Sequence, residues 1–186
     1  MRLASALALL VMLVLLVMVI ALPMVGCRGE AARIAAASDG TLLSPYLALG
    51  EVLADDSVAG LPELAAKVVE AAQARTDEAG VDAMLVAAGR MASPDIATAR
   101  LMYAKMSEGM IAWLAAHADQ REGLILIHCP MTFNNQGAYW VQREGKILNP
   151  YEGSMMLHCG AKLDWSAHRE GQPPSEAAAL EGMQAR

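Results

Sequence analysis

The segment SPDIATARLMYAKMSEGMIAWLAAH, residues 93–117, carries the clearest structural signal in the chain. Its large side chains recur every seven residues along one line, with a second line beside it, as in an amphipathic helix. The first line holds Ile96, Tyr103, Met110 and His117, and the second holds Ala99, Met106 and Trp113. Ser93-Pro94-Asp95 is typical of a helix start. We therefore predict a long helix from about residue 95 to about residue 117.

Three further segments upstream show the same kind of pattern. Ser44-Pro45 opens a predicted helix that ends near residue 55, and Leu61-Pro62-Glu63 opens a second one with apolar residues on one side. An alanine-rich third segment covers residues 77–90. Four amphipathic helices with short connections are what a four-helix bundle requires, so the predicted fold class is mainly α.

The pattern changes after Gly123. Residues 124–127 form a short apolar run of β type, while 139–141 and 146–148 flank Glu144-Gly145 like the two strands of a hairpin. The sequence therefore predicts a helical-bundle domain over 42–165 with a short C-terminal β-hairpin or loop appendix. Residues 166–186, which include Pro173-Pro174, are predicted to form a flexible tail.

The first 26 residues differ from the rest of the chain. They hold 22 apolar residues and a single charge, Arg2, and they lead into Val25-Gly26-Cys27, which resembles the lipobox of bacterial lipoproteins. We predict a lipoprotein-type signal peptide over 1–26, lipid attachment at Cys27 and a tether over 27–41. The apolar run is also long enough for an uncleaved membrane anchor. Either reading predicts an exported, membrane-attached protein of the cell envelope or periplasm.

Charge and motif content exclude several function classes. Beyond residue 26 lie 13 of the 14 basic residues and all 20 acidic ones, a formal net charge of −7. A nucleic-acid binder would need a concentrated basic face, so nucleic acid is not an expected partner. The sequence contains no GxSxG, HExxH, phosphate-loop or dinucleotide motif. We expect neither enzymatic activity nor a small-molecule substrate.

The chemistry-bearing residues lie in the segment 128–160. Cys129 and Cys159 each follow a histidine, and each has methionine within three residues. Thiolate and thioether sulfur are soft ligands that favour Cu(I) or Ag(I) over hard cations. Met131, two residues from Cys129, is the better thioether candidate. The weaker metal candidates are His128, His158 and Met155, because neighbours in an extended segment face opposite sides.

A disulfide is the main alternative for the two cysteines. In an exported protein, a pair of cysteines is often bonded. Closing a loop of about 30 residues would contribute on the order of 3 to 4 kcal/mol in the chain-entropy treatment. Residue types alone leave the choice between metal ligation at Cys129 and Cys159 and a disulfide between them open.

The order of short motifs in this region resembles a bacterial exported domain of unknown function. The shared pattern is Cys129-Pro130-Met131, then Asn135-Gln136-Gly137-Ala138-Tyr139-Trp140, Asn149-Pro150-Tyr151-Glu152-Gly153 and Met156-Leu157-His158-Cys159-Gly160. That family occurs alone or joined to periplasmic adaptor subunits of copper and silver efflux systems. The resemblance implies that metal-efflux proteins are partners.

By position, the resemblance also assigns roles to individual residues. It implies that Cys129, Met131, Met156 and Cys159 are soft-metal ligands. It further implies a turn scaffold made of Asn149, Pro150, Tyr151 and Gly153. Glu152 stands where the family has an aromatic residue.

Overall fold

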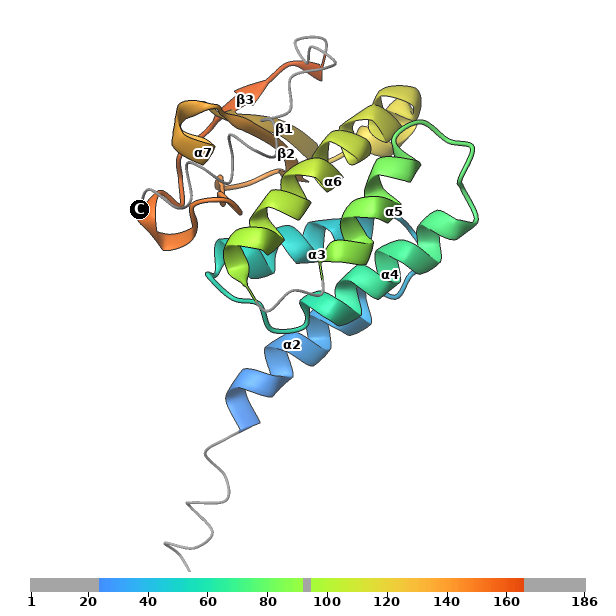
Figure 1. Ribbon diagram of the computed structural model, residues 1–186, viewed down its shortest axis with the longest axis horizontal. Helices are drawn as coiled ribbons and strands as arrows, with labels where there is room; N and C mark the ends of the chain where they lie inside the picture. Colours follow the sequence, from blue (N-terminus) through green and yellow to red (C-terminus); the bar gives the residue numbers. More distant parts are fainter. Residues whose placement is uncertain (1–23, 92–94, 166–186) are drawn as a thin grey trace, which may run out of the picture.

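The computed structural model describes residues 24–91 and 95–165, with side chains from residue 29 onward. Within these ranges the chain is mainly helical with a small antiparallel sheet, which confirms the predicted fold class (Figure 1). The helices are α2 (Met24–Ala36), α3 (Leu43–Ala54), α4 (Leu61–Gln73), α5 (Val81–Arg90), α6 (Ile96–Ala116) and the short α7 (Thr132–Asn135). The strands are β1 (Leu124–Cys129), β2 (Ala138–Arg143) and β3 (Ala161–Leu163), with 3-10 turns η1 (Ala118–Arg121) and η2 (Gly153–Met155).

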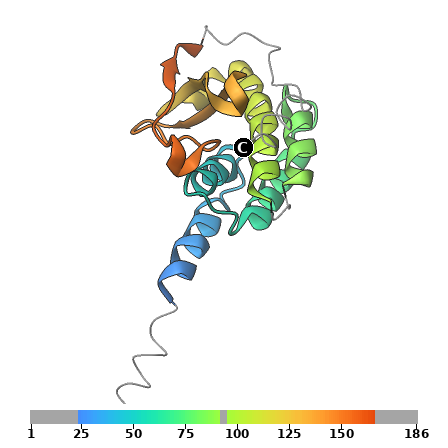
Figure 2. The same cartoon turned by 60° about the vertical axis from the view of Figure 1, so that its left-hand side comes forward.

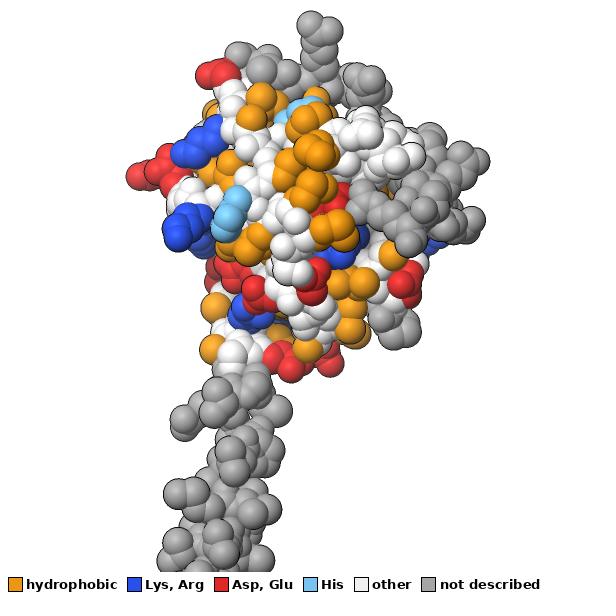
Figure 3. Space-filling model, turned by 90° about the vertical axis from the view of Figure 1, so that its left-hand side faces the viewer, with side chains coloured by type: hydrophobic (Ala, Val, Ile, Leu, Met, Phe, Trp, Pro, Cys, Tyr) orange, Lys and Arg blue, Asp and Glu red, His pale blue; other side chains and the backbone are white. Residues whose placement is uncertain are grey.

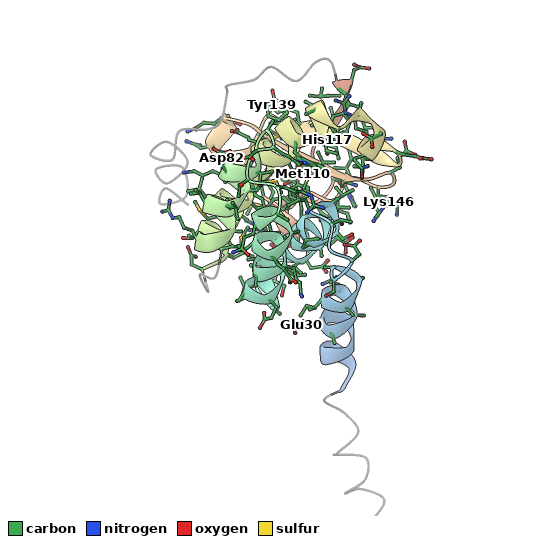
Figure 4. The ribbon with its side chains drawn as sticks, turned by 90° about the vertical axis from the view of Figure 1, so that its right-hand side faces the viewer. Glu30, Asp82, Met110, His117, Tyr139 and Lys146 are labelled. Atoms are coloured by element: carbon green, nitrogen blue, oxygen red, sulfur yellow. The ribbon has the colours of Figure 1, made fainter. Side chains whose placement is uncertain are left out.

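Helix α6 confirms the prediction from the 93–117 segment. Asp95 caps it, because its carboxylate accepts the backbone N–H groups of Ala97 and Thr98. Met110 is fully buried within the helical body, whereas His117 lies at the C-terminal end of the helix (Figure 4). The predicted apolar lines therefore form the face by which α6 joins the core.

Helices α3, α4 and α5 also occur where the sequence places them. Helix α5 begins at Val81 rather than Asp77, because Gly80 takes the preceding position with a positive φ of 77°. Each helix packs on the next one, and α3 also contacts α6. Gly80 and Gly109 permit the closest approach of α5 to α6, since a Cβ on either residue would overlap the backbone of the other.

The segment predicted as a tether is largely helical. Helix α2 projects from the body and its last turn reaches α3 (Figure 1). Arg33 forms ion pairs with Asp55, at 2.5 Å, and with Glu51, at 4.0 Å. Cys27 lies in α2, but its side chain is outside the described residues, as are the apolar run through residue 23 and the tail 166–186. No helix in the described part of the chain is long and apolar enough to cross a membrane.

The predicted pairing of residues 139–141 with 146–148 is wrong. The strand order is β2-β1-β3, and both outer strands run antiparallel to β1. Residues 146–148 form no strand because the Gln142 side chain takes up their backbone groups. Its amide nitrogen donates to the Lys146 carbonyl at 2.7 Å, and its oxygen accepts the Leu148 N–H at 3.0 Å. The third strand comes instead from 161–163.

Figure 2 shows the sheet beside the helices, with β2 in contact with α3 and α6. Buried tyrosines join these two layers. The backbone N–H of Val141 donates to the Tyr46 hydroxyl of α3 at 3.0 Å. The Tyr151 hydroxyl donates to the carbonyl of Tyr139 at 2.6 Å. Both hydroxyls also contact Ser107 of α6, so one polar network links α3, α6, β2 and the loop after β2.

Candidate dithiol site

The structure brings Cys129 and Cys159 together. Cys129 is the last residue of the central strand β1, is paired with Ala138 of β2 and is fully buried. Cys159 lies just before β3 and is half-buried. Their Sγ atoms are 2.8 Å apart although 30 residues separate them in sequence. Both are free thiols, so the site is a dithiol with one buried member and one that reaches solvent.

Cys129 affects the ionisation of Cys159. The hydrogen bond to Cys129, burial and the negative charge of Glu152 together raise the pKa of Cys159 to about 11. Cys159 is therefore protonated at neutral pH. Metal ligation requires the thiolate, so a metal that binds both sulfurs has to displace protons.

Asn149 fixes the backbone around Cys159. Its side chain is fully buried, and its amide nitrogen donates to the carbonyl of Cys159 at 3.0 Å. Its side-chain oxygen accepts the N–H groups of Tyr151 and Glu152, and its own N–H donates to the carbonyl of Leu157 at 2.7 Å. One asparagine thus holds both ends of the turn that leads to Cys159.

The methionine candidates lie on the segments that flank the dithiol. Met131 is 48% exposed and Met155 is 69% exposed, whereas Met156 is half-buried. Figure 3 shows hydrophobic side chains gathered on the face that carries α7 and η2. Among the described methionines, Met131 and Met155 differ from those that pack into the core, such as Met102, Met106 and Met110.

Met131 belongs to a loop with unusual backbone geometry. Phe133, Asn134 and Asn135 in α7 all have positive φ, between 51° and 65°. Asparagine tolerates this left-handed region, but phenylalanine rarely adopts it. Phe133 is held there by burial and by its contact with the Tyr151 ring, at 5.4 Å between centroids. The hydroxyl oxygen of Thr132 is buried without a hydrogen-bond partner in the described part of the chain.

The two neighbouring histidines are engaged elsewhere. His128 stacks on Tyr139 with the ring centroids 4.3 Å apart, and burial lowers its pKa. His158 is exposed, and its Nδ1 lies 2.7 Å from the carbonyl of Ile147. Over residues 24–91 and 95–165, no three His, Cys, Asp or Glu side chains gather as a possible metal site. The structure therefore assembles the two cysteines without a histidine beside them.

Sequence reasoning missed three residues that shape this region. Glu152 is 5% exposed, and its charge acts on Cys159. Only its departure from the family pattern marked it out. Asp56 and Arg100, more than 40 residues away from Cys159, hold the turn that precedes it. Arg100 lies within the amphipathic pattern of α6, and that pattern does not distinguish a solvated arginine from a bridging one.

A separate cavity of about 330 Å³ lies between α3, α6 and β2. Leu47, Tyr103, Trp140 and Leu148 line it, together with charged residues that include Glu51 and Arg143, and neither cysteine is part of its wall. The dithiol thus lies outside this cavity. Comparison of the chain with models of protein families, with curated proteins and with solved structures gives no match.

Proposed function

We propose that this chain is a non-enzymatic binding domain of the cell envelope that holds one Cu(I) or Ag(I) ion between Cys129 and Cys159. The observation that carries the proposal is the juxtaposition of two free thiols, one buried and one half-buried, from segments 30 residues apart. Soft monovalent metals favour thiolate and thioether donors, and Met131 and Met156 supply thioethers on the same two segments.

The geometry allows metal entry with a small movement. With metal–sulfur bonds of roughly 2.3 Å, two thiolates on one ion lie roughly 3.8 Å apart in a tetrahedral arrangement and farther apart in a linear one. The present separation is 2.8 Å. Binding therefore moves the sulfurs apart by about 1 Å or more, and the short irregular segment around Cys159 is better suited to move than strand β1.

The proposal also includes attachment of the domain to the membrane and transfer of its metal to an efflux system. Cys27 follows the apolar N-terminal run and is the proposed lipid acceptor, with an uncleaved anchor as the alternative. The four helices α3 to α6, acting as a bundle, would support the site. The domain would buffer the metal or pass it to a metal-efflux protein. Labelling with a palmitate analogue tests the anchor: equal labelling of wild type and Cys27→Ser contradicts lipid attachment.

An anaerobic titration tests the metal site. Reduced protein is titrated with Cu(I) against a competing chelator, and wild type is expected to bind one ion. The Cys129→Ser/Cys159→Ser variant should lose that binding, and Met131→Leu should weaken it. Met155→Leu changes the weaker and more exposed thioether candidate, and it should reduce the affinity less than Met131→Leu does. Equal affinity in wild type and in the double cysteine variant contradicts the proposed ligand set.

A second candidate function is a disulfide-stapled structural or interaction module. The specific observation in its favour is the 2.8 Å separation, which is shorter than two thiolates on one metal require and closer to a covalent bond. Mass mapping of alkylated peptides from protein purified without reductant discriminates the two. Free thiols at Cys129 and Cys159 support the metal site, whereas a linked peptide pair supports the staple.

A further inference from the structure

The turn that leads to Cys159 contacts the helical body. Cys159 itself lies two residues before Ala161, which pairs with His128 of β1, whereas the chain from the end of β2 to Cys159 forms only the short turn η2 and no strand. Arg100 of α6 reaches this segment, and its side chain is only 15% exposed. Its Nε donates to the carbonyl of Pro150 at 3.0 Å, and its Nη2 donates to the carbonyl of Leu53 at 3.1 Å. One guanidinium thus ties the turn after β2 to the end of α3.

Asp56 completes the connection. Its Oδ1 accepts from Arg100 Nη2 at 2.6 Å, and its Oδ2 accepts the backbone N–H of Ser154 at 2.9 Å. The hydrogen bonds from Ser154 and Arg100 lower the pKa of Asp56 to about 2, so this carboxylate stays charged at neutral pH. Asp56 and Arg100 together form a clasp over residues 150–154.

The turn packs closely against Asp56 and Arg100 at Gly153. The φ of this glycine is 53°, and a Cβ at this position would collide with Asp56 Oδ1 and Arg100 Nη2. The backbone of the turn therefore lies directly against the ion pair. The glycine of the NPYxG motif is required both by its backbone conformation and by this contact.

Asn149 connects the clasped turn to Cys159 by hydrogen bonds. The carbonyl of Asn149 accepts the N–H of Gly153 at 3.1 Å, inside the clasped turn. The Asn149 side chain donates to the carbonyl of Cys159 at 3.0 Å, and this residue lies outside the clasped turn. On the other side, Cys129 is fixed by its register with Ala138 in the sheet. The sheet therefore positions Cys129, while the pairing of β3 with β1 and the clasped turn together position Cys159.

We propose that Arg100 and Asp56 are positioning residues of the dithiol, which hold Cys159 against Cys129 and so set how readily the two sulfurs act together. This inference rests on the proposed function only in taking the cysteine pair as the functional site, and it holds whether the pair binds metal or forms a disulfide. Loosening the clasp lowers the effective concentration of one thiol at the other.

Equilibration with glutathione measures that effective concentration directly in the metal-free chain. Glutathione disulfide accepts two electrons from the dithiol, the Cys129–Cys159 bond forms, and the two protons leave on two glutathione thiols. Alkylation of the quenched mixture gives the oxidised fraction, and hence the reduction potential. A tenfold change in this equilibrium corresponds to about 30 mV.

The key variant is Arg100→Met, with Arg121→Met as the matched control. Arg121 also donates to two backbone carbonyls, those of Leu114 and Ala115, but at the opposite end of α6. We expect Arg100→Met to disfavour the disulfide about tenfold, and Arg121→Met to leave the equilibrium within about twofold of wild type. Arg100→Lys keeps the positive charge but lacks the planar guanidinium that donates to several acceptors at once. Its equilibrium constant should lie between those of Arg100→Met and Arg121→Met. Equal equilibria for Arg100→Met and Arg121→Met would overturn the proposal.

Asp56→Asn provides a second test in case Arg100→Met does not fold. Asparagine accepts the positive φ of 54° at this position but lacks the charge that pairs with Arg100. A several-fold shift in the same direction supports the clasp, and an unchanged equilibrium contradicts it. The Cu(I) titration is read separately. If wild type binds no Cu(I), the metal proposal is wrong. If the clasp proposal is wrong, only the glutathione equilibrium shows it.

Discussion

Closing the Cys129–Cys159 pair should raise the thermal stability of the domain by a predictable amount. The two cysteines are 30 residues apart in sequence and their sulfurs are already adjacent in the folded chain. A disulfide between them reduces the number of conformations open to the unfolded chain and requires no rearrangement of the fold. In the chain-entropy treatment, a loop of about 30 residues contributes about 3.6 kcal/mol at 25 °C.

This free energy converts to a shift in melting temperature. For a domain of roughly 120 residues, the unfolding entropy is about 2.1 cal/mol/K per residue, or roughly 0.25 kcal/mol/K in total. The oxidised protein should therefore melt about 14 °C above the reduced protein. Native-state strain would reduce this value, and the adjacency of the two sulfurs argues that such strain is small.

Differential scanning calorimetry of oxidised and reduced wild type measures the shift. The Cys129→Ser/Cys159→Ser variant is the control and should melt at one temperature with or without reductant. A difference below about 3 °C in wild type would refute the reasoning, because it would mean that closing the bond strains the fold nearly as much as it restricts the unfolded chain.

Three further predictions concern the helical body. Gly109→Ala should lower the free energy of unfolding by about 1–3 kcal/mol, because its Cβ would overlap the backbone of Gly80; in a urea titration the control Gly89→Ala, with open space around it, should be neutral or stabilising. Burial raises the pKa of Glu108 to about 7, so the folded protein binds that proton more tightly than the unfolded chain and stability falls as pH rises from about 4.5 to 7. Glu108→Gln should therefore be more stable than wild type near pH 8 but not near pH 4, and equal stability differences at both values would contradict this. Asp95→Ala should cost about 1 kcal/mol by thermal denaturation at neutral pH, whereas Asp95→Asn should retain most of the cap.

Local signals in the sequence were sufficient to predict α3, α4, α5 and α6, but not α2 or the short α7. Ser44-Pro45, Leu61-Pro62 and the 93–117 segment combine start residues with helical periodicity, and α3, α4 and α6 begin within three residues of those signals. These features depend on neighbours along the chain. The prediction of a mainly α class therefore did not require knowledge of the tertiary contacts.

Contacts between distant segments explain what the sequence could not predict. The pairing of 139–141 with 146–148 failed because one side chain, Gln142, replaces the strand contacts that periodicity suggests. The cysteines could be named as a pair, but their adjacency involves the pairing of β1 with β3 and a turn that Asp56 and Arg100 contact. Neither residue carries a local pattern that indicates contact with the segment before Cys159.

The tyrosine contacts along β2 have a consequence for association with other chains. An edge strand with free N–H and carbonyl groups is a template on which other chains can add strands and aggregate. On β2 the outward N–H of Val141 and the outward carbonyl of Tyr139 are bound by the hydroxyls of Tyr46 and Tyr151. Replacing either tyrosine with phenylalanine would leave a buried or partly buried backbone group of β2 without its hydrogen bond, so the atoms that join the two layers also satisfy the edge of the sheet.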